Sequence, residues 1–170
     1  TAVRTTEPGW PTSLQAIATK AAQQPTYRFG GLYRLLNEAN LRVCFFQLRK
    51  DAAPGVDGVT FEAYERNLEA NLADLVQRLK SKRYHARLVQ SAVAQILSAI
   101  YEADFLPCSY GYRPDRGAHD AVRNLTDALF YGKHEFVLEA DIEGYFEHIQ
   151  WDWVLRVLAR LVNVGAWVGL

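Results

Sequence analysis

Residues 136–149 join a short apolar run to a row of carboxylates, and they are the strongest candidate for chemistry in the sequence. The stretch reads FVLEADIEGYFEHI, with Glu139, Asp141 and Glu143 at alternate positions after the apolar run 136–138. Side chains alternate between the two faces of a strand, so the three carboxylates would share a face for as long as the strand continues. The pattern predicts a buried strand with an acidic end. The alternative is that Asp141 merely ends a strand.

Charge is unevenly distributed along a chain that has no net charge. The 170 residues include 19 Lys and Arg and 19 Asp and Glu, and 49% are hydrophobic, which fits one domain with a real core. Residues 78–87 contain five cations and no acid, whereas residues 135–152 contain six carboxylates and no Lys or Arg. The first segment is suited to phosphate and the second to a metal ion. The alternative for both is an ordinary solvated face.

The two cysteines and the absence of long apolar runs point to a reducing compartment. Cys44 and Cys108 are far apart and lack metal-ligand spacing, which argues against a disulfide scaffold or a zinc site. We expect both to be free thiols. The sequence has no stretch long enough to cross a bilayer, so we expect no membrane partner and a cytoplasmic location.

Most of the chain has helical periodicity. A helix is predicted in residues 10–25, capped by Thr12 or Ser13, and another from Leu32 to Leu48 with a break near 37–40. The turn 51–58 then precedes a helix that Thr60 can cap. That helix carries apolar residues at steps of three and four from Phe61 to Leu79. Further helices are predicted at 91–105, 117–132 and 152–162, the last capped by Asp152. With the strand at 136–138, the predicted class is α+β.

Five ordered blocks of the sequence resemble the N-terminal half of a group II intron reverse transcriptase, the maturase protein of bacterial retroelements. The blocks are LYRLLNEANL, RKDAAPGVDGVTFEAYERNLEANL, LKSKRY, QSAVAQILSAIYEADFLPCSYGYRPDRGAHDAVRNL and VLEADIEGYFEHI. The resemblance covers residues 28–161. It implies a mainly helical, partial fingers and palm domain of a right-hand polymerase with a small antiparallel sheet. Residues 1–27 would be a tail with a short helix, and residues 162–170 an unmatched tail.

The resemblance implies an RNA-directed DNA polymerase that acts on an RNA template and a DNA primer. Such enzymes hold two Mg²⁺ ions with carboxylates, and the ions clamp the attacking and leaving oxygens. By the match, Asp141 is a catalytic carboxylate and metal ligand, with the Ile142 carbonyl beside it. Phe146 falls where the family places the ring that senses the sugar 2′ position. Tyr145 would support it in nucleotide binding.

Six cations are candidates for RNA binding. They are Lys80, Lys82, Arg83, Arg87, Arg113 and Arg116. The alternative for the cluster at 80–87 is that cations at a helix end are stabilised by the helix dipole. For Arg113 the alternative is an ion pair with a local acid such as Asp115 or Asp120, because Arg suits phosphate and carboxylate equally.

Three departures from the family pattern bear on activity. The fingertip hairpin, which carries the ligands of the incoming triphosphate, is missing between Val89 and Gln90. The sequence contains no Asp-Asp pair for the second metal motif, and the resemblance fades at residue 163. In addition, Glu143, Glu147 and Trp151 stand where the family has Lys, Asp and His.

The predicted function is therefore that of a truncated, internally deleted reverse transcriptase fragment that is inactive alone and binds Mg²⁺ weakly. One alternative is a non-catalytic module that binds intron RNA, against which the overall neutrality counts. Another is a decayed fragment without function, which would melt over a broad, non-cooperative range.

Overall fold

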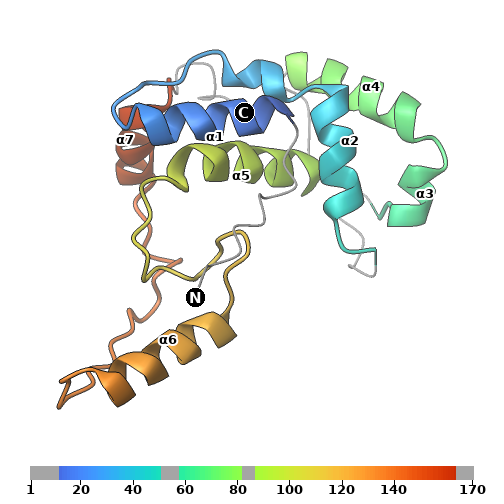
Figure 1. The fold of residues 1–170 in the computed structure, drawn as a ribbon. Helices are drawn as coiled ribbons and strands as arrows, with labels where there is room; N and C mark the ends of the chain where they lie inside the picture. Colours follow the sequence, from blue (N-terminus) through green and yellow to red (C-terminus); the bar gives the residue numbers. More distant parts are fainter. Residues whose placement is uncertain (1–11, 51–57, 82–86, 164–170) are drawn as a thin grey trace.

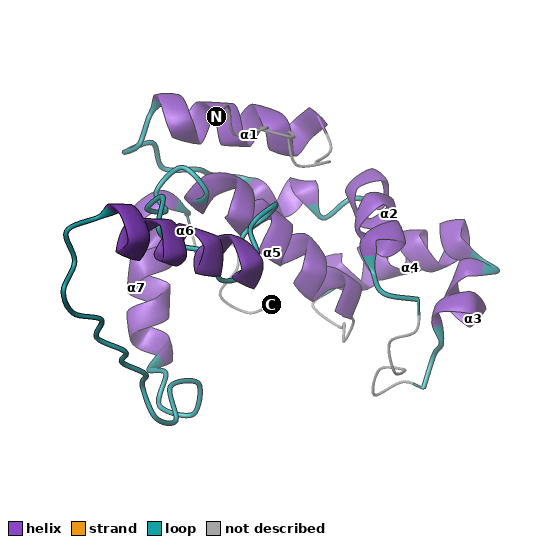
Figure 2. Cartoon of the chain, turned by 60° about the horizontal axis from the view of Figure 1, so that its bottom comes forward, coloured by secondary structure: helices purple, strands orange, loops and turns teal. Residues whose placement is uncertain are grey.

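The computed structural model describes residues 12–50, 58–81 and 87–163, and within these ranges the regular elements are helices (Figures 1 and 2). The helices are α1 (Thr12–Gln23), the 3₁₀ helix η1 (Leu32–Leu35), α2 (Glu38–Gln47), α3 (Phe61–Glu65), α4 (Leu68–Lys80), α5 (Arg87–Tyr101), α6 (Ala118–Tyr131) and α7 (Trp151–Leu161). The predicted tail at 1–11, the turn at 51–57 and residues 164–170 lie outside the described residues. No helix in the described ranges is long and apolar enough to span a membrane.

The predicted strand at 136–138 is wrong, and so are the small antiparallel sheet and the α+β class. Residues 133–142 form a loop, in which Phe136 and Leu138 are 90% and 92% exposed. A strand needs a neighbour to pair with its backbone N–H and C=O groups. The described residues contain no such neighbour. The expectation of a mainly helical chain agrees with the structure.

An isolated parallel bridge between Phe29 and Val162 joins the two ends of the described chain. The backbone N–H of Phe29 donates to the Leu161 carbonyl at 2.6 Å, and that of Asn163 donates to the Phe29 carbonyl at 2.8 Å. The Tyr101 hydroxyl also donates to the Leu158 carbonyl at 3.3 Å. These bonds fix the C-terminal end of α7 beside the connection that follows α1 and beside the end of α5.

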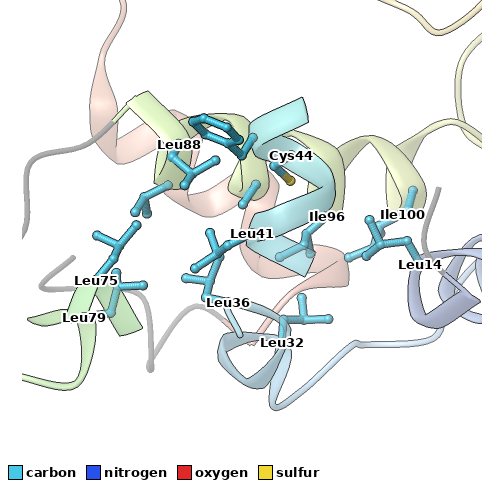
Figure 3. Close-up of a cluster of buried hydrophobic side chains, with 14 of the residues drawn as sticks. Leu14, Leu32, Leu36, Leu41, Cys44, Leu75, Leu79, Leu88, Ile96 and Ile100 are labelled. Atoms are coloured by element: carbon cyan, nitrogen blue, oxygen red, sulfur yellow. The ribbon is translucent and has the colours of Figure 1, made fainter. Parts of the chain in front are cut away.

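The core lies where α5 packs against α1 and α2, and where α2 packs against α4 (Figure 1). Figure 3 shows Leu41 of α2 between the side chains of α4 and those of α5. The most completely buried side chains are Leu14, Leu41, Leu72, Leu75, Leu79, Ile96, Ile100, Val89 and Cys44. Full burial of each such aliphatic side chain contributes about 1.5–3 kcal/mol, so this cluster supplies most of the hydrophobic stabilisation of the described residues.

The predicted break near residues 37–40 is confirmed, and two asparagines shape it. Asn37 caps α2, because its side chain accepts a hydrogen bond from the backbone N–H of Asn40 at 3.0 Å. The Asn40 side chain is buried. Its Nδ2 donates to the Leu35 carbonyl at 2.9 Å, and its Oδ1 accepts from the Ser13 hydroxyl at 3.2 Å. A buried amide with both ends satisfied thus links α1 to the turn between η1 and α2.

The predicted single helix from Phe61 is divided into α3 and α4, although Thr60 caps it as expected. The Thr60 side chain accepts from the backbone N–H of Ala63 at 3.2 Å. In a continuous helix the Tyr64 carbonyl would accept a hydrogen bond from the backbone N–H of residue 68. Here Asn71 Nδ2 donates to that carbonyl at 2.9 Å instead. The Asn71 side chain therefore takes the place of a helical hydrogen bond at the break.

The remaining helices lie close to their predicted positions. Val89 and Gln90, where the family hairpin is missing, lie inside the continuous helix α5, and Val89 belongs to the core. Helix α7 begins after Gln150 without a side-chain cap, so Asp152 lies in its first turn and is not the predicted cap. In Figure 1, α6 lies apart from the layer that α1, α2 and α5 form.

Candidate functional site

A compact turn between the loop 133–142 and α7 presents the predicted polymerase residues. Gly144 has φ +61°, a left-handed conformation that favours glycine. Its carbonyl accepts from the backbone N–H groups of Glu147 and His148, both at 3.1 Å, and lies 2.7 Å from His148 Nδ1. A Cβ at position 144 would come within 2.9 Å of His148 Nδ1. Both the conformation and the close approach therefore favour glycine here.

This turn gathers four of the predicted site residues around one open hollow. The hollow is lined by Asp141, Ile142, Gly144, Tyr145, Phe146 and Glu147. The Tyr145 and Phe146 rings meet edge to face, with centroids 5.3 Å apart and planes 73° apart. A carboxylate, a backbone carbonyl and two aromatic rings thus lie together as the sequence motif predicted. Their catalytic and nucleotide-binding roles stay predictions.

The described residues do not supply a closed site for Mg²⁺. Asp141 Oδ1 accepts a hydrogen bond from the backbone N–H of Ile142 at 2.9 Å. No group of three or more His, Cys, Asp or Glu side chains in the described ranges is placed to hold a metal ion. The expectation that Glu139, Asp141 and Glu143 share one face depended on a strand that is not formed. No step of a reaction is derived through Mg²⁺ here.

The predicted basic cluster is only partly described. Lys80 is exposed at the C-terminal end of α4, one turn from an ion pair between Arg78 Nη2 and Asp74 Oδ2 at 2.7 Å. Lys82 and Arg83 lie outside the described residues. Arg87 is the first residue of α5, and its side chain is also outside them.

Arg113 is a buried structural residue of the loop between α5 and α6. Its guanidinium pairs with Glu102, Nη2 to Oε1 at 2.6 Å, and not with Asp115 or Asp120. Its Nη1 donates to two carbonyls of the same loop, Leu106 at 2.8 Å and Ser109 at 2.9 Å. With its donors directed to protein acceptors and its side chain 5% exposed, Arg113 is not presented to a bound RNA in this structure.

Arg116 also contributes to this loop but remains more accessible. Its Nη1 donates to the Pro107 carbonyl at 2.6 Å, and its guanidinium lies 5.7 Å from the centre of the Tyr110 ring. The Tyr110 hydroxyl in turn bonds to Asn124 of α6. The loop therefore attaches α6 through side chains. Sequence reasoning missed Glu102, although an acid at the end of the preceding helix was a signal for a partner of Arg113.

Comparison with known proteins relates the chain to proteins encoded by group II introns. No protein-family model matches it. Protein YkfC of Escherichia coli is 27% identical over an alignment of 180 residues that covers 86% of this chain and 47% of YkfC. The group II intron-encoded protein LtrA of Lactococcus lactis is 24% identical, over 80% of this chain and 27% of LtrA. The mitochondrial nuclear intron maturase 1 of Arabidopsis thaliana is 25% identical, over 51% and 12%.

The chain spans about half the length of YkfC and about a quarter of that of LtrA. The aligned region takes in most of this chain, including the core helices and the turn at 143–148 on any placement that covers 86% of it contiguously from either end of the match at 28–161 or beyond. The chain is thus related to group II intron-encoded proteins and intron maturases.

Proposed function

We propose that this chain provides part of the fingers and the first palm residues of a group II intron reverse transcriptase, an RNA-directed DNA polymerase. The observation that carries the proposal is the gathering of Asp141, Ile142, Tyr145 and Phe146 around one hollow. The relatives encoded by group II introns support the same assignment. In this role Asp141 is the first catalytic carboxylate, and RNA template and DNA primer are the partners.

We further propose that the chain alone does not polymerise DNA. Two-metal phosphoryl transfer needs carboxylates that hold both ions, and this sequence has no Asp-Asp pair. An internal deletion is supported by the YkfC alignment, whose 180 residues exceed the 170 of this chain. A chain without the triphosphate-binding hairpin lacks the charges that position the incoming nucleotide.

Primer extension tests this proposal. The purified chain, an RNA template, a DNA primer and all four deoxynucleotides are incubated with Mg²⁺, and a full-length group II intron reverse transcriptase serves as the positive control. We expect no template-directed product, with the same result for Asp141→Asn. Incorporation that follows the template and disappears in Asp141→Asn would show that another acid completes the site, and would contradict the proposed inactivity.

RNA binding is the activity that such a fragment retains in our proposal, and Lys80 is its best-described cation. Each phosphate contact made by a Lys or Arg releases counterions, so Lys80→Ala should lower the slope of log affinity against log salt by about 1. Lys133→Ala, another exposed lysine but one beside the acidic segment 135–152, is the matched control and should leave the slope unchanged. Equal effects of the two substitutions would contradict the assignment of Lys80.

A further inference from the structure

The segment between α6 and α7 exposes an unusually apolar surface. Phe136, Leu138, Ile142, Phe146 and Trp151 have exposed fractions of 68% or more. We call these five side chains the 136–151 surface. An aromatic side chain has about 150–250 Å² of surface, so the three rings alone present roughly 400 Å² or more. A monomeric soluble protein rarely exposes a larger apolar patch than this without a binding role.

The backbone beneath this surface is also open. No hydrogen bond joins the N–H or C=O groups of residues 133–140 to another residue of the described part of the chain. Figure 2 shows this stretch as a long loop between α6 and the turn that precedes α7. Another polypeptide backbone can satisfy such groups, as peptide recognition through main-chain hydrogen bonds demonstrates. Nucleic acids and lipids have no comparable repeating set of donors and acceptors.

The charge around the surface defines the partner more closely. Residues 134–155 contain no Lys or Arg. Their carboxylates are Glu135, Glu139, Asp141, Glu143, Glu147 and Asp152. This anionic surroundings repels phosphate groups. A second copy of the chain, placed on the same face by two-fold symmetry, would bring the carboxylates against one another.

We propose that the 136–151 surface docks a basic polypeptide segment of a partner protein, one in which apolar side chains are interspersed with Lys or Arg. The apolar side chains would cover the aromatic rings, and the cations would pair with the surrounding carboxylates. This docking is independent of the proposed function, because it uses exposed side chains and charge and requires neither RNA nor polymerisation.

Three short labelled peptides test the proposal by fluorescence anisotropy at low salt. One alternates Val and Lys, the second replaces Lys with Glu, and the third replaces Val with Ser. We expect the Val/Lys peptide to bind about tenfold or more tightly than either of the others, because only it supplies both apolar area and positive charge. Its affinity should fall as salt is added.

Variants of the chain locate the binding site. The double substitution Phe136→Ser with Leu138→Ser should weaken binding of the Val/Lys peptide by about tenfold. Leu106→Ser, which replaces another exposed leucine far along the chain, should leave it unchanged. Both variants should keep the circular dichroism of the native helices, since both change exposed loop side chains. A loss of binding can therefore be separated from a loss of folding.

Three results would overturn the proposal. The first is equal binding of the Val/Lys and Val/Glu peptides, or binding that the Phe136 and Leu138 substitutions leave intact. The second is a dimer in sedimentation velocity that the same double substitution dissociates, which would make a second copy the occupant. The third is a single-stranded RNA that binds more tightly than the Val/Lys peptide and is lost with the same variant.

Discussion

Arg113 and Glu102 form a largely buried ion pair, with Nη2 of the arginine 2.6 Å from Oε1 of the glutamate. Arg113 Nε is a second donor to the same carboxylate, at 3.1 Å from Oε1. The arginine side chain is 5% exposed and that of the glutamate 28%. The pair fixes the loop that leads from the core helices to α6, so its energetic role is structural.

Removal of Glu102 should destabilise the protein strongly. Glu102→Ala leaves the Arg113 guanidinium buried without its counter-charge, and breaking a fully buried pair costs about 3–5 kcal/mol. Because Glu102 is partly exposed, we expect about 2–4 kcal/mol in urea unfolding. Glu65→Ala, at an exposed glutamate, should change stability by about 0.5 kcal/mol or less. Similar losses for the two variants would show that the pair contributes little.

Leu72 should be among the most sensitive positions of the core. It is fully buried in α4, so Leu72→Ala removes transferred surface and leaves a cavity, at a cost of about 2–5 kcal/mol. Val122→Ala, on the exposed face of α6, should cost only a few tenths of that amount. Thermal or urea unfolding measures both. A loss for Leu72→Ala as small as that for Val122→Ala would place this face of α4 outside the core.

Cys44 should make the protein less stable at alkaline pH. Burial raises the pKa of its thiol from 9.0 to about 11, because the thiolate is poorly solvated in the core. The unfolded thiol ionises first, so the stabilisation is complete below pH 9 and is lost as the pH rises towards 11. The loss attributable to Cys44 should be about 2–3 kcal/mol.

The variant Cys44→Ala isolates this effect from that of Tyr101, whose pKa burial also raises. Urea unfolding at several pH values should show a smaller alkaline loss in Cys44→Ala than in the native chain. Parallel pH profiles for the two proteins would rule out the assigned cause. In the folded protein, alkylating reagents should modify the exposed Cys108 and spare Cys44.

Asp141→Asn should leave the melting temperature unchanged or slightly higher. The substitution removes one of six carboxylates in a segment without Lys or Arg, and thereby reduces like-charge repulsion. Asp74→Asn is the comparison, because it removes a carboxylate that pairs with Arg78 and should lower the melting temperature slightly. A clear decrease for Asp141→Asn would indicate a stabilising contact of its carboxylate.

The sequence predicts the helices well because their signals are local. The apolar periodicity placed the helices near their observed positions, and Thr60 was identified as a cap from its position before Phe61. The break between α3 and α4 was missed, since the apolar stripe continues across it. That break depends on the bonds between Asn71 and Tyr64, and side-chain competition for a backbone carbonyl leaves no mark on periodicity.

The errors concern features that depend on distant partners. The apolar run 136–138 has the composition of a strand, but composition cannot supply the neighbour that pairs with it. Helix α6 likewise has an amphipathic stripe of Val122, Leu125 and Leu129, all of which are exposed. The Glu102 partner of Arg113 is brought near by the path of a loop. The motif residues 141–146 were recognised because they are neighbours in sequence.

The bridge between Phe29 and Val162 has a consequence for how the chain tolerates breaks and insertions. It closes a loop of about 130 residues, and the entropy of such closure changes by only about 0.6 kcal/mol for each doubling of length. Extra residues between α5 and α7 would therefore hardly weaken the joined ends. A protease that nicked the exposed loop at 133–142 would likewise leave α7 held by Phe29 and Tyr101, so the two pieces should remain together as one non-covalent particle.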